Sequence, residues 1–414
     1  MTRLRPAPPA TQLPSESGLA RAVSLHSASA LPGNTSSTKN TPLLKPASPS
    51  DTGLPSWQRR LLRSAPASLL FAGLRWTHRR KLLVLTYHSV VDAPAAEAAR
   101  RRYAPLYRNA VSAERFERQM RFLKDHYHLA GSEDLRAFLD GAALPEPSVL
   151  LTFDDGLINN YTVAWPILRR LGLPAFFFLP TAFLDDASDG TPRSHWSEAV
   201  TALLLGPTDP DERRRAVREV MPHQAPPPNG SPETLATQVV TALKALPDDR
   251  RRRRVETLRA RLDGLPPSAL PADREGHSVL ETMTWTQARE MADEGAVMGA
   301  HGVSHAILSR LPEPEAQAEI RRSVARVEEQ IGRTCDVFAY PNGGAADFTP
   351  AHERALTDAG CRAAFTQMSG FNAPPPPRPT ALRRIDVSPD HALGAFRYKS
   401  SGAKLLVDRV VRGR

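Results

Sequence analysis

Short apolar runs alternate with amphipathic segments from Lys81 almost to the end of the chain, and this alternation constrains the fold more than any other feature. A short apolar run is typical of a buried strand, and apolar residues at helical spacing are typical of a surface helix. Strand, helix and strand in repetition predict an α/β fold with a parallel sheet, either open or closed into a barrel. The predicted strands are 82–87, 149–153, 175–179, 296–300, 337–340 and 363–366, and the predicted helices are 112–125, 161–171, 285–294, 314–331 and 350–359.

Composition divides the chain into four parts. Residues 1–56 are rich in proline and serine and contain no aromatic side chain, so they cannot bury enough apolar surface to offset chain entropy, and we predict a disordered tail. Residues 81–414 form one predicted α/β domain, which a mainly helical insertion at 190–282 interrupts. Residues 57–80 mix Leu, Phe and Trp with Arg and leave two interpretations open: a helix packed on the domain and interrupted near Pro66, or a basic amphipathic segment on an anionic membrane surface.

The chain carries 54 Lys and Arg against 44 Asp and Glu, a net charge of +10. The positive charge is scattered apart from an arginine run at 250–254, and no nucleic-acid motif accompanies that run, so we expect a solvated helix face and no nucleic-acid partner. No stretch approaches the ~18 consecutive apolar residues of a membrane span, and no secretory signal is recognisable. These observations predict a location in the cytoplasm or at the cytoplasmic membrane face, with Cys335 and Cys361 as reduced core thiols.

Two adjacent carboxylates end one of the predicted strands. The apolar strand at 149–153 leads directly into Asp154, Asp155 and Gly156. In parallel α/β folds the working residues lie at the carboxyl ends of strands. One interpretation is a turn, because Asp and Gly commonly leave a strand. The other is a catalytic pair, in which one carboxylate binds a metal ion and the other acts as a general base.

Two histidines follow another predicted strand at a spacing that suits one metal ion. His301 and His305 stand four residues apart after the strand at 296–300, so their imidazoles share a face if the segment turns helically. With one carboxylate from Asp154 or Asp155 they would make a two-histidine, one-carboxylate set. Such a set leaves coordination positions open, as catalytic rather than structural metal sites do.

Two further strand ends carry weaker signals. Pro341, Asn342 and Gly343 form an ordinary turn sequence whose backbone amides can face the same site. His88 follows the first predicted strand. A lone histidine there indicates a structural residue, but beside a metal ion it becomes a candidate acid, because imidazole titrates near neutral pH.

Taken in order, these segments resemble the polysaccharide deacetylase family, the NodB homology domain of carbohydrate esterase family 4. The Thr-Phe-Asp-Asp-Gly at 152–156 matches the first motif of the family, the His-x-x-x-His at 301–305 the second, and the Pro-x-Gly loop at 341–343 the third. The match covers roughly 81–190 and 283–390. The resemblance implies a distorted parallel (β/α) barrel of the NodB type.

The resemblance also implies roles for these residues. Asp155, His301 and His305 would hold one divalent metal ion, usually zinc, with cobalt, nickel or iron as alternatives. Asp154 would be the general base that takes a proton from the attacking water. A backbone amide of the 341–343 loop would stabilise the oxyanion.

The chain departs from the family pattern in the third motif. Ala339 and Asn342 stand where the family carries Arg and Tyr, so the residue that orients the base has to come from elsewhere, and Arg384 is our candidate. The late motif that usually supplies the catalytic acid is not evident. The sequence Leu-Thr-Tyr-His88 is similar to the poly-N-acetylglucosamine deacetylases, a branch that uses this histidine as the acid, and this similarity implies the same role for His88.

The resemblance thus implies a metal-dependent hydrolase that removes N-acetyl groups from an N-acetylated amino-sugar polysaccharide or its precursor and releases acetate. Two alternatives stay open: an amidase of a small non-sugar amide, and a non-catalytic carbohydrate-binding or scaffold protein on the same fold. Trp196 and Trp285, near the ends of the insertion, would either stack on the rings of a glycan substrate or belong to the core.

Overall fold

The computed structural model describes most of the chain after residue 64. The described residues are 65–92, 103, 105–106, 109–190, 194–221, 230–264, 278, 280–387 and 392–412. The predicted tail at 1–56 lies outside them. The chain divides into two units, Met1–Pro49 and Ser50–Arg414, and every described residue belongs to the second. Among these residues no helix is long and apolar enough to cross a membrane.

Parallel strands form the centre of the second unit. They are β1 Leu82–Tyr87, β2 Ser89–Val91, β3 Ala110–Ser112, β4 His128–Leu129, β5 Ser148–Phe153, β6 Phe176–Leu179, β7 Val297–Ala300, β8 Val337–Ala339, β9 Ala363–Phe365 and β10 Ile385–Asp386. Eight of them build one sheet in the order β10-β1-β5-β6-β7-β8-β9, with β4 beside the start of β5, while β2 pairs with β3. A bridge between Phe365 of β9 and Leu382, just before β10, brings the two edges together. The sheet therefore curls into a distorted (β/α) barrel, and the predicted fold class is confirmed.

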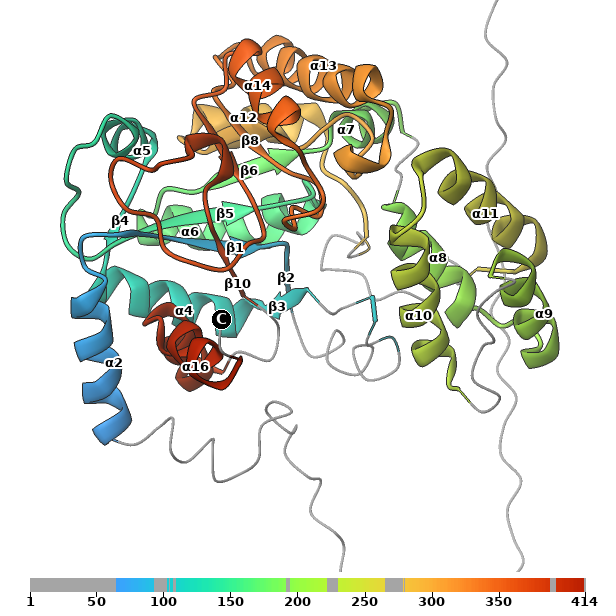
Figure 1. Cartoon of the computed structure of the whole chain (residues 1–414), viewed down its shortest axis with the longest axis horizontal. Coiled ribbons are helices and arrows are strands. Elements are labelled where there is room, and N and C mark those ends of the chain that lie inside the picture. Colours follow the sequence, from blue (N-terminus) through green and yellow to red (C-terminus); the bar gives the residue numbers. More distant parts are fainter. Residues whose placement is uncertain are drawn as a thin grey trace, which may run out of the picture. The chain divides into compact units, whose positions relative to one another are not determined.

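Helices surround the sheet and connect its strands. Figure 1 shows α12, α13 and α14 together beyond one side of the strands and α4 on the other side. The helices are α2 Ala65–Thr77, α4 Ala113–His126, α5 Ser132–Leu139, α6 Trp165–Leu171, α7 Thr181–Ser188, α8 Trp196–Leu205, α9 Pro210–Val220, α10 Pro232–Lys244, α11 Asp248–Arg261, α12 Trp285–Asp293, α13 Glu313–Ile331, α14 Pro350–Asp358, α15 Leu393–Ser400 and α16 Ala403–Arg412, with a π-helical turn at Asn160–Ala164 and short 3-10 turns at Leu308–Arg310 and Pro379–Ala381.

Successive residues of each strand face opposite sides of the sheet. Leu85 of β1 and Leu151 of β5 belong to the large core between the sheet and the helices. Val84 and Leu150 point the other way and belong to a smaller core inside the barrel. Both sides of the strands are therefore apolar, which explains why the strands appear in the sequence as continuous apolar runs.

The predicted insertion at 190–282 contains four described helices, α8 to α11, which gather as one group in Figure 1. They enclose a hydrophobic core of their own, in which Val200, Leu204, Val239 and Leu258 are fully or almost fully buried. A helical group with its own core can keep its shape while it is joined to the barrel at only a few points.

The arginine run at 250–254 does not form the fully solvated helix face that we expected. Arg251 is 4% exposed, hydrogen-bonds to Asp248, and lies with its guanidinium carbon 4.8 Å from the centre of the Trp196 ring. The physical reason is helical geometry: five consecutive residues turn through more than 360°, so at least one of them has to face the helix group.

The described part of the 57–80 segment is α2. Pro66 is the second residue of this helix, in the first turn, where a missing N–H costs nothing, so the interruption expected near Pro66 is absent from the described residues. One side of α2 packs on the domain: Phe71 is 2% exposed, and its ring lies 6.0 Å from that of Tyr398.

The two cysteines are free and buried, as predicted for core thiols. Burial raises the pKa of the Cys361 thiol to about 12 and the pKa of Cys335 well above its ordinary value. Both thiols are therefore neutral and inert in the folded chain.

Candidate active site

The carboxyl ends of six strands, β1, β5, β7, β8, β9 and β10, line one cavity of about 370 Å³ at the mouth of the barrel. Parallel strands place their carboxyl ends at the same edge, so residues from distant motifs meet there. Of the residues that the sequence analysis singled out, seven line the cavity: His88, Asp154, Asp155, Trp196, His301, His305 and Asn342. Pro341, Gly343 and Arg384 do not line it.

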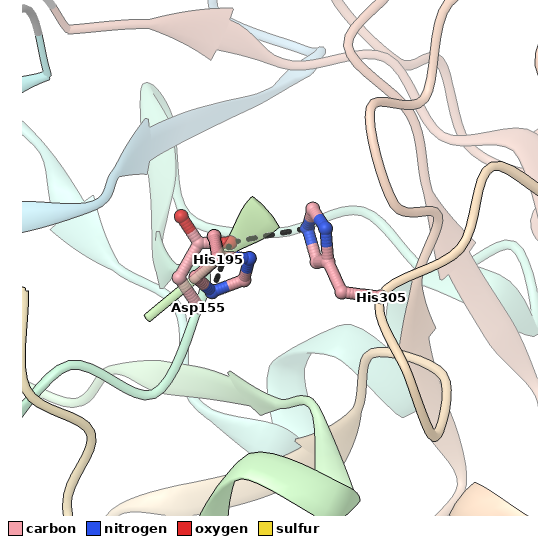
Figure 2. A group of neighbouring side chains, drawn as sticks. All are labelled: Asp155, His195 and His305. Carbon is pink, nitrogen blue, oxygen red and sulfur yellow. Dashed lines mark ion pairs between the residues drawn. The ribbon is translucent and has the colours of Figure 1, made fainter. Parts of the chain in front are cut away.

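Asp155 lies among three imidazoles. Its Oδ1 is 3.3 Å from His305 Nε2, 3.5 Å from His301 Nε2 and 3.8 Å from His195 Nε2. Figure 2 shows Asp155 between His195 and His305, with both ion pairs drawn. Sequence reasoning found His301 and His305 but missed His195.

A carbonyl fixes the tautomer of His301. His301 Nδ1 lies 2.7 Å from the carbonyl oxygen of Ala339, which can only accept, so Nδ1 carries the proton and donates. This hydrogen bond leaves Nε2 free to face Asp155. A histidine that donates from one ring nitrogen to a carbonyl is oriented as metal-ligating histidines usually are.

Three residues that line the cavity have left-handed backbone conformations. Asp155 has φ +77°, His305 +55° and Asn342 +65°, and these are the only non-glycine residues with positive φ among those that the structure describes. This conformation costs a residue with a side chain about 1–2 kcal/mol. Such strain persists where the surroundings determine it and clusters at functional sites, which favours a functional role for this cavity.

Glu319 of α13 holds the loop between the two predicted histidine ligands. Its Oε2 accepts from the backbone N–H of Val303 at 2.7 Å and of Ser304 at 2.9 Å, and its Oε1 accepts from the Ser304 hydroxyl at 2.8 Å. The loop is thereby fixed between Gly302 and His305, and it presents His305 to the cavity in its left-handed conformation.

Asp154 has a different partner from Asp155. Arg384 donates from Nη1 to Asp154 Oδ1 and from Nη2 to Oδ2, both at 2.8 Å, and its other donors contact Thr366 O and Thr152 Oγ1. Arg384 is 0% exposed and lies in the interior of the barrel. Gln367 adds a hydrogen bond to Asp154 Oδ2 at 3.3 Å.

The two carboxyls have lowered pKa values for different reasons. Burial raises the pKa of Asp154, but the positive charges of Arg384 and His301 outweigh burial, and the pKa lies below the ordinary 3.8. Burial also raises the pKa of Asp155. The charge of His195 and the interactions with His301 and His305 outweigh burial and bring this pKa well below 3.8. Both groups are therefore carboxylates near neutral pH.

The imidazoles of the cavity differ in their preference for a proton. Burial lowers the pKa of His305 to about 3, with the charge of His195 acting in the same direction, and burial also lowers the pKa of His195. His301 is the exception: burial lowers its pKa, but Asp155 and Asp154 outweigh burial and raise it overall. The carboxylates thus attract positive charge to the place where the imidazole nitrogens converge.

Fewer backbone amides of the loop after β8 are available to bind an oxyanion than the sequence suggested. Pro341 has no N–H, and the N–H of Gly343 donates to Pro341 O at 2.8 Å. Of the three predicted loop residues, only Asn342 then has an amide left for a substrate oxygen. The Asn342 side chain is used otherwise, since its Oδ1 accepts from Lys244 at 2.7 Å and its Nδ2 donates to Asp347 at 2.9 Å.

The insertion contributes residues that no motif pointed to. His195, Trp196 and Lys244 all line the cavity. The adjacent His-Trp pair was the one available signal, and nothing in its spacing connects it with the two motifs. Trp285 does not line the cavity: it is 3% exposed within the large core and donates to Asp185 at 2.7 Å, so its interpretation as a sugar-stacking residue is wrong.

The side chains of this cavity fit a divalent cation. Within the part of the chain that the structure describes, one group of three ligand atoms lies within 4.8 Å of one another, from Asp155, His195 and His305. Two donors on one tetrahedral ion with bonds of about 2.1 Å lie about 3.4 Å apart, close to the 3.3, 3.5 and 3.8 Å that separate Asp155 Oδ1 from the three imidazole nitrogens. Among the residues that the structure describes, the buried Nε2 of His195 also has no hydrogen-bond partner.

The fold and the cavity define a parallel (β/α)-barrel protein with a carboxylate and imidazole cluster at its mouth. The sequence model of the polysaccharide deacetylase family matches residues 141–221 and 272–364, which include the Asp-Asp pair and both motif histidines. These two stretches are similar to the polysaccharide deacetylase family, and the resemblance seen in the sequence is confirmed. His88 and Arg384 lie outside the matched stretches.

Individual relatives agree with this family. The chain is 31% identical over 101 residues, 24% of its length, to Bacillus subtilis YxkH, named as a candidate polysaccharide deacetylase, and 30% identical over 122 residues, 29% of its length, to the poly-beta-1,6-N-acetyl-D-glucosamine N-deacetylase of Escherichia coli K12. The matches span 32% and 17% of these relatives. The solved structure of Streptococcus pyogenes deacetylase PplD with acetate superposes with a TM-score of 0.49 at 16% identity, over 78% of this chain and 99% of that one.

Proposed function

We propose that the chain is a metal-dependent hydrolase that removes N-acetyl groups from an N-acetylated amino-sugar polysaccharide or its precursor. One observation carries the proposal: two adjacent carboxylates at one strand end have different partners, a guanidinium for Asp154 and imidazoles for Asp155. This division supplies a general base and a metal ligand within one cavity. The similarity to a poly-beta-1,6-N-acetyl-D-glucosamine N-deacetylase supports the substrate class.

The metal-binding part of the proposal concerns Asp155, His301 and His305. These side chains would hold one divalent cation, with zinc as the first candidate and cobalt, nickel or iron as alternatives. When bound, such a cation lowers the pKa of a coordinated water and polarises the acetamide carbonyl. The proton transfers are made by the protein's own groups.

Asp154 acts as the general base in this proposal. The bidentate contact with Arg384 fixes the plane of the carboxylate. Oδ2 also accepts from Gln367, whereas among the described residues Oδ1 accepts from Arg384 alone and keeps a lone pair for a proton. Its lowered pKa keeps it ionised at neutral pH, so it is ready to accept the proton of the attacking water. Arg384 is a positioning residue, because it acts through Asp154.

His88 supplies the proton for the leaving amine nitrogen. It stands beside Asp154 at the neighbouring strand end, where the pairing of Tyr87 with Phe153 sets β1 and β5 in register. Its buried Nδ1 has no hydrogen-bond partner among the described residues, so this nitrogen is available to carry a proton. The Asn342 N–H then stabilises the oxyanion of the tetrahedral intermediate.

The two alternatives differ from this proposal in what they require of the cavity. A non-catalytic carbohydrate-binding protein would not need an ionised base held by two hydrogen bonds, nor strained ligands, and both features are present. An amidase of a small non-sugar amide would need the same groups, so the substrate alone separates it from the glycan enzyme.

Acetate release from three substrate classes tests the proposal. The cation-loaded chain is offered poly-β-1,6-N-acetylglucosamine oligomers, chito-oligosaccharides and small acetamides, beside Asp154→Asn and the control Asp189→Asn, which changes an exposed carboxylate. We expect acetate from a glycan and a loss of about 10²–10⁴-fold in Asp154→Asn only. Acetate from small acetamides alone would favour the amidase, and no acetate from any substrate would favour the binding protein.

We also propose a peripheral contact with an anionic membrane surface through the 57–80 segment. It is supported by three apolar side chains of α2 that face solvent: Leu69 is 75% exposed, Leu70 59% and Trp76 65%. Arg79 and Arg80 follow the helix after one intervening residue, His78. More of the protein should co-sediment with phosphatidylglycerol vesicles than with phosphatidylcholine vesicles. A Leu69→Ser, Leu70→Ser variant should co-sediment less with phosphatidylglycerol vesicles. Equal co-sedimentation of the wild type and the variant would contradict the contact.

A further inference from the structure

His195 belongs to the insertion, yet its side chain lies in the cavity at the barrel mouth. It is the N-cap residue of α8, is 4% exposed, and has an Nε2 without a hydrogen-bond partner among the described residues. Buried polar atoms in folded proteins nearly always have a hydrogen-bond partner, so this nitrogen calls for an explanation.

The surroundings of His195 aim that nitrogen at Asp155. The imidazole meets the ring of Phe183 edge-on at 4.6 Å and that of His305 at 4.3 Å, which restricts its rotation. Nε2 lies 3.8 Å from Asp155 Oδ1, on the carboxylate oxygen that the other two imidazoles also face. The contact is too long for a hydrogen bond and suits two ligands on one cation.

We propose that His195 is a further ligand of the cation held by Asp155, so that the bound ion fastens the helical insertion to the mouth of the barrel. The inference rests on the proposed function in one respect, since both need a cation at Asp155. Asp155, His195 and His305 form the described group whose ligand atoms all lie within 4.8 Å of one another, and His301 is not in that group. Three protein ligands leave a coordination position for water, as catalytic zinc sites do.

The consequence for the insertion follows from where it contacts the site. Lys244, at the end of α10, donates to Asn342 Oδ1 at 2.7 Å and makes one attachment. His195, at the start of α8, would make a further attachment, and this one would depend on the cation. Trp196 is the next residue and lines the cavity, so the cation would also hold this aromatic wall in place.

Cobalt binding to the full chain tests the inference. His195→Asn removes the imidazole but keeps a residue type that N-caps helices well, so α8 should still form. His128→Asn, a histidine of β4 outside the cavity, is the matched control. Each protein is stripped of metal, titrated with Co²⁺ followed by its visible absorption, and compared with and without Co²⁺ by hydrogen exchange of the α8 amides. Thermal unfolding without metal checks that the variants fold.

We expect the wild type and His128→Asn to bind about one Co²⁺ per chain and to slow exchange in α8 on binding. His195→Asn should bind Co²⁺ at least about tenfold more weakly, since even outer-shell partners contribute that much, with a changed absorption spectrum and no slowing in α8. Unchanged affinity and spectrum in His195→Asn would overturn this inference and leave the proposed function standing. Absence of Co²⁺ binding in the wild type would overturn both.

Discussion

Arg384 holds Asp154 through two hydrogen bonds of 2.8 Å, one to each carboxylate oxygen, although the two residues are 230 positions apart in the chain. Both side chains are buried, and the other guanidinium donors contact Thr366 and Thr152. A planar guanidinium fixes a carboxylate in one orientation, which a single ammonium does not. The pair therefore determines where the proposed base points.

Arg384→Lys tests this orientation. Lysine keeps the positive charge but loses the bidentate geometry, so we expect kcat to fall about 10²-fold or more while KM changes little. Steady-state deacetylation kinetics measure both constants. Arg383→Lys, which changes the exposed neighbouring arginine, should stay within about twofold. If the kcat of Arg384→Lys equals that of the wild type, the positioning role of Arg384 is contradicted.

Glu319→Gln tests the support of the histidine loop. The change turns one of the two carboxylate oxygens into an amide nitrogen, which cannot accept a hydrogen bond. At the Oε2 position the loop loses the bonds from the Val303 and Ser304 N–H groups, and at the Oε1 position it loses the bond from the Ser304 hydroxyl. We expect metal affinity to fall about 10–100-fold, as for other outer-shell partners, measured by competition with a chelator. Glu315→Gln, on the exposed side of the same helix, should bind metal as the wild type does. Equal affinity in both variants would contradict the role of Glu319.

The Asp154–Arg384 pair predicts a specific acid sensitivity of stability. The pKa of Asp154 lies below 3.8 in the folded chain and near 3.9 when unfolded, so the pair contributes stability above the unfolded value and loses it as pH falls through the folded value. Without metal, the Tm of the wild type should fall more steeply between about pH 5 and 2 than that of an Asp154→Asn, Arg384→Met double variant. Parallel Tm curves would contradict this.

The buried thiols should not react in the folded chain. Because the pKa of Cys361 is about 12 and that of Cys335 also lies well above its ordinary value, both stay protonated up to about pH 9, and labelling by a thiolate-selective disulfide reagent should be negligible. Unfolding in guanidinium should release two reactive thiols per chain. Rapid labelling of the native protein would show that the core around β8 and β9 opens readily.

The barrel could be predicted from the sequence because its strands are buried on both faces. Leu82–Tyr87 was predicted with the observed bounds, and the other five predicted strands lie within one residue of the observed ones at each end. The strands that were missed have two or three residues, such as His128–Leu129 and Ile385–Asp386, too short for a pattern to emerge.

The candidate site could be predicted where it depends on local motifs and not where it depends on packing. Asp154, Asp155, His301 and His305 stand directly after apolar strands, so their meeting at one edge follows from the fold class. His195 comes from a helical insertion whose placement no periodicity fixes. Helical geometry already excludes a fully solvated run of five arginines. That Arg251 is the one that turns inward depends on packing, because it lies against Trp196 of the neighbouring helix.

The most direct test of the account is acetate release by the same chain with and without a cation. After metal removal the wild type should release no acetate from N-acetylated amino-sugar oligomers, and reloading with one divalent ion should restore release. Reloaded Asp154→Asn should still bind one ion, yet its rate of acetate release should be at least about 100-fold lower than that of the wild type. A reloaded wild type that binds its ion and releases no acetate, or an Asp154→Asn variant as active as the wild type, would contradict the account.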